Sequence, residues 1–216
     1  NTVEMSFWSS EYSIEGVRPR LVVEYIFGTL PTPTTSPETT VTGTVSPSPS
    51  PTLTATPGGT EMVLQQGHLG YAGTEDTYIS EWEPSANFGN NVDMIVRNAN
   101  IRSPLVRFDL SGVPSGATIN QATLELYCIA QSNPGTLTMD LHPVLRPWAE
   151  LQATWTAATS GTNWSIPGCA DEGTDYGPLV ARRDTSTVNT WHQWDVTGLV
   201  QGWMASPTTN HGLIIK

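Results

Sequence analysis

The histidines and carboxylates of this chain are the residues that could do acid–base chemistry, but their spacing matches no common catalytic motif. The four histidines are scattered along the sequence, and none belongs to an HExxH motif. There is no GxSxG elbow and no glycine-rich phosphate loop. Asp109 and Asp195 precede Leu-Ser and Val-Thr, where an aspartate commonly caps a turn or a helix. His192, between two tryptophans, is typical of a packed histidine. We therefore predict no catalytic residues, although an acid pair for glycoside hydrolysis stays open among the many carboxylates.

Oxygen-bearing side chains gather between residues 75 and 93, where they could hold a structural calcium ion. Calcium takes about six to eight oxygen ligands from carboxylates, amides and backbone carbonyls. The segment lacks DxDxDG spacing, so hydrogen bonding within a tight loop is the alternative interpretation. The candidate ligands are Glu75, Asp76, Asn87 and Asn90, followed by Asn91 and Asp93. No other cofactor is predicted.

Tryptophan is abundant, with eight residues in a chain of 216. Most tryptophans in proteins are largely buried, so the majority should belong to the core. An indole face that remains exposed can stack against a sugar ring. We select Trp164 and Trp191 as candidates for sugar stacking.

The two cysteines, Cys128 and Cys169, form no CxxC motif. In a secreted chain they would form one disulfide closing the loop 129–168. Two buried free thiols are the alternative; we predict the disulfide.

The charge of the chain is sparse and acidic, with 20 Asp and Glu against 9 Lys and Arg and a net charge of −11. A negative surface repels phosphate backbones and anionic lipids, so we expect no nucleic-acid or membrane-surface partner. No apolar run reaches the roughly 18 residues of a membrane span. The chain begins Asn-Thr-Val without a signal peptide, which predicts a mature or excised piece.

Residues 29–60 have the composition of an extended linker, because 22 of the 30 residues from 31 to 60 are Thr, Ser or Pro. Such a segment has too little apolar surface to offset its ordering entropy. The composition is also typical of an O-glycosylated stalk outside the cell, with a bare linker as the alternative. The candidate glycosylation sites are Thr32, Thr34, Thr35, Ser46, Ser48, Ser50, Thr52 and Thr54.

The chain after the linker predicts a sheet with one face in a core. Residues 122–129 alternate, with Ala122, Leu124 and Leu126 on one face and polar residues with a tyrosine on the other. One short helix is expected over 197–204. Many short strands with almost no helix predict an all-β, jelly-roll-type β-sandwich. The expected strands cover 77–82, 92–98, 105–110, 122–129, 136–144, 192–196 and 212–216.

Several of these segments, taken in order, resemble the DNRLRE (disaggregatase-related) domain family. The motifs are TEDTYI at 74–79, NFG at 87–89, LVRFDLS at 105–111, ATLELY at 122–127, RPW at 146–148 and WDVT at 194–197. The resemblance covers most of residues 65–216. It implies a jelly-roll β-sandwich in secreted bacterial or archaeal surface proteins, some of which bind carbohydrate, and it implies no universal catalytic residue.

The chain departs from this resemblance in the order of its strands. Similar domains continue beyond a Gly-Leu-Ile-Ile-Lys segment through Ser-Ser-Glu and end on a strand like RPRLVVEY. Here FWSSEY stands at 7–12 and RPRLVVEY at 18–25, ahead of the linker. We therefore divide the chain into donor strands at 1–28, the linker at 29–60 and a sandwich at 61–216 that lacks its last strands. The side chains expected to fill the sandwich are Val3, Met5, Phe7, Leu21, Val23 and Tyr25.

Three arrangements could bring the displaced strands to the open edge. The chain could be one period of a tandem repeat, a subunit whose residues 1–27 complete the next copy, or a circular permutant that completes itself. The first two give head-to-tail contacts that do not close, which is the geometry of a filament. We predict a structural subunit or repeat of an extracellular fibre, with copies of itself as partners. The alternative is a carbohydrate-binding module of a larger secreted enzyme or adhesin, with glycans as partners.

Overall fold

The computed structural model describes residues 2–26 and 59–216, and the all-β class is confirmed. All seven expected strands are present. Four others were not expected. Two of them, β3 and β11, lie at the edges of the large sheet, where polar residues hide the strand pattern, and the short β9 and β10 form a separate two-stranded sheet. The strands are β1 (Glu4–Trp8), β2 (Arg20–Ile26), β3 (Thr60–Gln65), β4 (Thr74–Ser80), β5 (Asp93–Arg97), β6 (Arg102–Phe108), β7 (Thr118–Gln131), β8 (Leu137–Pro143), β9 (Ala157–Thr159), β10 (Thr162–Asn163), β11 (Ala181–Thr185), β12 (Thr190–Asp195) and β13 (Leu213–Ile215). The helical elements are α1 (Thr197–Ala205) and the 3-10 turns η1 (Glu15–Val17), η2 (His68–Gly70) and η3 (Pro207–Thr209).

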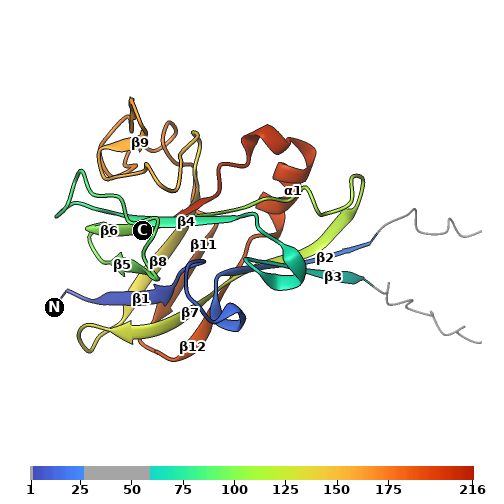
Figure 1. Ribbon diagram of the computed structural model, residues 1–216, viewed down its shortest axis with the longest axis horizontal. Helices are drawn as coiled ribbons and strands as arrows, with labels where there is room; N and C mark the ends of the chain where they lie inside the picture. Colours follow the sequence, from blue (N-terminus) through green and yellow to red (C-terminus); the bar gives the residue numbers. More distant parts are fainter. Residues whose placement is uncertain (1, 27–58) are drawn as a thin grey trace, which may run out of the picture.

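Eleven of the strands form one curled antiparallel sheet whose two halves face each other. Sheet I consists of β12, β7, β1, β5, β2 and β3, and sheet II of β4, β6, β13, β8 and β11. The halves meet where β5 pairs with β6 through Arg97 and Arg102. Figure 1 shows β1, β7 and β12 below and β4 and β6 above. Buried side chains from both halves form the main core, as a jelly-roll β-sandwich requires.

The displaced strands complete the sandwich of their own chain. Strand β1 lies between β5 and β7, and β2 lies between β7 and β3. The structure therefore has the third, intrachain arrangement rather than completion by a neighbouring copy. The inward faces are those expected from the alternation. The buried side chains on them are Val3, Met5, Phe7, Leu21, Val23 and Tyr25, none more than 7% exposed.

The ends of the linker meet at one position of sheet I. Tyr25 near the end of β2 pairs with Thr60 at the start of β3, so the chain leaves and re-enters the sheet at adjacent strands. Figure 1 shows β2 and β3 side by side there. The predicted glycosylation sites, from Thr32 to Thr54, lie outside the described residues.

Sheet II is buried on both faces around β13 and the middle of β6. Its inner face contributes to the main core, while Leu105 of β6 and Ile214 of β13 belong to a second core on the outer face. The second core is closed by Trp148 and Trp164 from the long connection between β8 and β11. A strand buried on both sides has consecutive buried residues instead of alternating ones, as β6 has from residue 103 to 106.

The predicted disulfide is wrong, because the two thiols lie in different cores. Cys128 is in the main core and Cys169 is in the second core, beyond sheet II. Both are free and fully buried. Burial raises the pKa of Cys128 to about 11 and that of Cys169 to about 12. Each thiol therefore stays protonated and unreactive at neutral pH.

We expect neither cysteine to react with a thiol reagent in the folded chain and both to react after unfolding in guanidinium chloride. A reducing agent should leave the thermal unfolding midpoint unchanged, because no bond is present for it to break. Counting free thiols before and after denaturation checks this. If the unfolded chain still shows no free thiol, the two cysteines are joined in the disulfide that the sequence predicted.

The described residues contain a single α-helix, α1, and no helix among them is long and apolar enough to cross a membrane. Helix α1 covers one end of the sandwich, with Val200 and Trp203 buried. Asp195 accepts hydrogen bonds from the backbone and hydroxyl of Thr197 at 2.9 and 2.6 Å, so it caps the turn that leads into α1. The helix N-cap is Val196, without a side-chain cap, so Asp195 does not cap the helix itself.

Candidate functional sites

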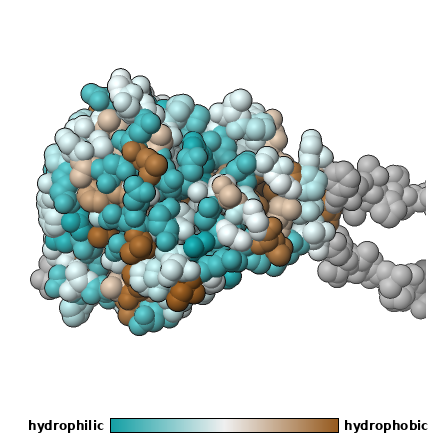
Figure 2. Space-filling model, viewed as in Figure 1, coloured by the Kyte–Doolittle hydropathy of each residue, from teal (hydrophilic) through white to brown (hydrophobic). Residues whose placement is uncertain are grey.

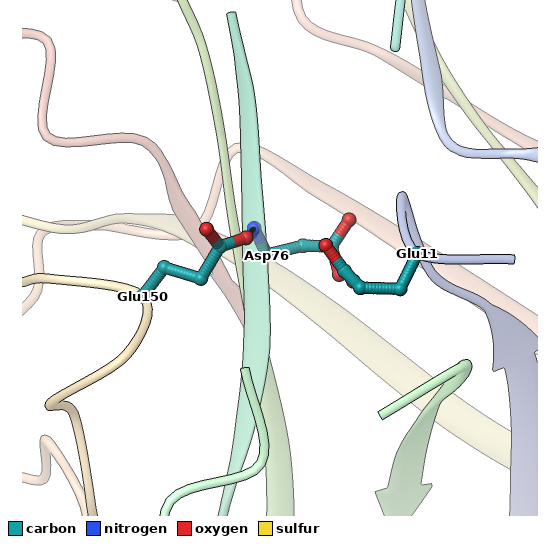
Figure 3. A group of neighbouring side chains, drawn as sticks. All are labelled: Glu11, Asp76 and Glu150. Atoms are coloured by element: carbon teal, nitrogen blue, oxygen red, sulfur yellow. Dashed lines mark hydrogen bonds between the residues drawn. The ribbon is translucent and has the colours of Figure 1, made fainter. Parts of the chain in front are cut away.

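Three carboxylates from distant segments form an acidic cluster, which is the first candidate site. Glu11 follows β1, Asp76 lies in β4 and Glu150 lies in the connection after β8. One oxygen from each lies within 4.8 Å of the others. Figure 3 shows Asp76 in the middle, with Glu11 and Glu150 on opposite sides. We call these three residues the acidic cluster.

Asp76 is the buried member of the acidic cluster. It is 1% exposed, and its Oδ2 accepts a hydrogen bond from the Ser10 backbone at 2.8 Å. Its Oδ1 is buried and has no hydrogen-bond partner. Burial, followed by the negative charge of Glu11, raises the pKa of Asp76 well above its ordinary value. A buried carboxylate oxygen without a donor is costly unless it binds a proton or a cation.

The other two carboxylates are held by hydrogen bonds to their surroundings. Glu150 accepts from the Asp76 backbone at 2.8 Å, and Glu11 accepts from the Ser10 hydroxyl at 2.9 Å. Partial burial is the main cause that raises the pKa of Glu150 to about 7, with Glu11 contributing. Arg107, the nearby cation, is paired with Glu75 outside the acidic cluster. The three carboxylates therefore lie close together, and the nearby arginine is paired with a different carboxylate.

The NFG motif positions the loop that carries Glu150. Asn87 Nδ2 donates to the backbone oxygens of Glu150 and Ala153 at 2.7 and 2.8 Å. A Cβ on Gly89 would lie 2.4 Å from the Glu150 carbonyl oxygen, so only glycine allows this approach. Asn87 is therefore a positioning residue rather than a calcium ligand.

Of the calcium ligands predicted from the sequence, only Asp76 belongs to the acidic cluster. Glu75 points to Arg107, as alternation along a strand requires, and Asn90 is exposed. The further candidates, Asn91 and Asp93, also lie outside the cluster. Glu11 and Glu150 were missed because they stand 65 and 74 positions from Asp76. The displaced Ser-Ser-Glu segment was the one available signal for Glu11.

The second candidate site is an aromatic platform on the outer face of sheet I, made of Trp191, Tyr127 and Arg20. Trp191 of β12 pairs in register with Tyr127 of β7, and their rings meet edge-to-face at 5.4 Å. The Arg20 guanidinium of β2 lies 4.2 Å from the Trp191 ring centre. Glu125 accepts hydrogen bonds from both Arg20 and Gln193. Aromatic and polar side chains of adjacent strands therefore lie together on the outer face of sheet I.

The other sugar-stacking prediction, Trp164, is wrong, because this residue is 3% exposed in the second core. Its indole N–H donates to the Thr154 carbonyl at 2.9 Å, which fixes the ring as a structural element. Trp82 is the most open tryptophan, at 55% exposed, but it lies in the turn after β4 rather than on a sheet face. Arginines lie over its ring, as Arg20 lies over that of Trp191. Of the two tryptophans predicted to stack against sugar, only Trp191, in the aromatic platform, lies on an outer sheet face.

His192 is a packed histidine, as its sequence context indicated. Its Nδ1 accepts from Arg183 at 3.0 Å and its Nε2 donates to the Thr187 carbonyl at 3.1 Å, which requires the neutral ring. Burial is the main cause that lowers its pKa, and Arg183 adds to the effect.

Acidification should therefore destabilise the chain through His192. The unfolded chain binds a proton near the ordinary pKa of 6.5, while the folded chain resists it. Stability is present above this pH and is lost as the pH falls below it. We expect His192→Gln to reduce the fall of the thermal midpoint between about pH 7.5 and 5.5. His68→Gln, at a half-buried position, is the control and should keep the full fall; equal falls in both variants would contradict the assignment.

A comparison with protein families matches residues 69–216 to carbohydrate-binding module family 96. This is more than half of the chain. The chain belongs to carbohydrate-binding module family 96. The matched part contains β4 to β13, including Asp76, Glu150, Tyr127 and Trp191.

The family 96 match bears on the sequence predictions in three ways. A carbohydrate-binding module agrees with the all-β sandwich and with the alternative function rather than with the fibre. The match gives no support to the DNRLRE assignment, although it covers the segments that carried that resemblance. A comparison with curated proteins finds no match.

Proposed function

We propose that this family 96 module binds a polysaccharide on the outer face of sheet I. The observation that carries the proposal is the aromatic platform, in which Trp191, Tyr127 and Arg20 lie on three adjacent strands. A sugar ring packs its C–H face against an indole, while its hydroxyl groups need donors and acceptors close by. The exposed amide of Gln193, next to the platform, offers both. We further propose that the module acts outside the cell, where polysaccharides occur.

The rigidity of the platform supports this proposal. Its side chains stand on β-strands rather than loops, and the ion pair between Arg20 and Glu125 orients the guanidinium that faces Trp191. A surface that is organised before binding loses less conformational entropy when the ligand arrives.

The fibre function is less well supported. A neighbour's strands would need the positions between β5 and β7 and between β7 and β3, which β1 and β2 of the same chain occupy. Figure 2 shows a largely hydrophilic surface with small, separate hydrophobic patches on the face in view. An obligate subunit contact usually buries a broader apolar area.

Affinity electrophoresis in gels containing neutral or uronic-acid polysaccharides tests the proposed function. We expect slower migration of the chain in at least one gel, reversed by adding the same glycan in free form. Bovine serum albumin in the same gels controls for sieving. Unchanged migration in every gel, together with an empty glycan array, would overturn the proposal.

A further inference from the structure

We propose that the acidic cluster of Glu11, Asp76 and Glu150 is a calcium-binding site that fastens the N-terminal segment to the sandwich. The acidic cluster is supported by a second, independent feature, the buried and unpartnered Oδ1 of Asp76. This site lies apart from the aromatic platform, and its function does not depend on sugar binding.

The spacing of the carboxylates suits calcium. Two oxygens bound to one calcium ion at about 2.3–2.6 Å lie no more than about 5 Å apart, and the three cluster oxygens lie within 4.8 Å of one another. Magnesium holds its ligands at about 2.0–2.1 Å in a strict octahedron, and it would need a tighter and more regular set. Three carboxylates and a tolerance for irregular geometry therefore point to the larger ion.

The degree of burial also suits a bound cation. Asp76 is buried, Glu150 is partly buried and Glu11 is exposed, so the acidic cluster has a closed inner end and an open outer end. An ion can enter past Glu11, and water can fill the remaining coordination positions on that side. Burial is the main cause of the raised pKa of Asp76 and the charge of Glu11 is the second; a divalent cation would offset both.

Calcium would cross-link three segments that are far apart in the sequence. Glu11 lies in the connection from β1 to β2, Asp76 in sheet II and Glu150 in the connection that covers the second core. Because β1 and β2 precede the linker, the ion would join the displaced N-terminal part to the rest of the sandwich. Its removal should loosen this attachment.

Isothermal titration of calcium chloride into the full chain, previously stripped with a chelator, tests the site. We expect one calcium ion per chain and weaker binding of magnesium. The thermal midpoint should rise by about 5–10 °C when free calcium is a hundred times its dissociation constant. No heat and no change of the midpoint at millimolar calcium would overturn the proposal.

Two variants and one control locate the site. Asp76→Asn and Glu11→Gln should each weaken calcium binding by about tenfold or more, since each removes a charged ligand. Glu11 is exposed, so Glu11→Gln remains informative if the buried variant fails to fold. Glu81→Gln removes the same charge from an exposed position outside the cluster and should keep the affinity of the original chain. Equal losses in Glu11→Gln and Glu81→Gln, or no loss in Glu11→Gln, would overturn the site.

Discussion

Replacing Phe7 with alanine should lower the free energy of unfolding by about 3–5 kcal/mol, the usual cost of deleting a buried aromatic side chain. Phe7 is fully buried in the main core and stands in β1, between β5 and β7. A loss of this size is a large part of the roughly 5–15 kcal/mol by which a domain is stable. Urea unfolding followed by tryptophan fluorescence measures it.

Ser6→Ala is the matched control, because Ser6 lies on the same strand with its side chain on the outer face. It should change stability by no more than about 0.5 kcal/mol. The intrachain position of β1 also predicts a midpoint that does not depend on protein concentration. A midpoint that falls on dilution would place Phe7 in the sandwich of another copy and restore the fibre model.

Replacing Trp191 with alanine should weaken polysaccharide binding by about 2 kcal/mol, or roughly thirtyfold in Kd. The change removes the central ring of the aromatic platform, while Tyr127 and Arg20 remain on their strands. Titration with the polysaccharide that retards the chain in gels measures the loss. Circular dichroism confirms that the fold is kept.

Trp82→Ala is the comparison for this prediction, because Trp82 is a more exposed tryptophan outside the platform. It should bind the polysaccharide as the original chain does. Loss of binding in Trp82→Ala with full binding in Trp191→Ala would move the sugar site to the turn after β4 and contradict the aromatic platform.

Strand content could be predicted because it depends on a local pattern. Residues 122–129 alternate in β7, and the same alternation in β1 and β2 correctly identified the inward side chains. Edge strands were harder to find. β11, with the sequence ARRDT, packs few apolar side chains and has no such alternation.

The candidate sites were predicted less completely. Asp76 and Trp191 were selected for their residue types, whereas Glu11, Glu150, Tyr127 and Arg20 were not selected. A ligand set gathered from segments more than 60 residues apart leaves no spacing to recognise. The same limit explains the disulfide error, because the sequence does not show that a sheet separates Cys128 from Cys169.

The all-β sandwich, the inward faces of its strands and the need of β1 and β2 to join a sheet could all be derived from the sequence. These properties follow from side-chain alternation, which each strand carries alone. The three-dimensional structure was needed to show that the chain completes its own sandwich, that three carboxylates meet around Asp76 and that Trp191, but not Trp164, remains on an outer face. Strand order and the packing of loops over sheet II set those distances, and both arise from contacts between residues far apart in the chain.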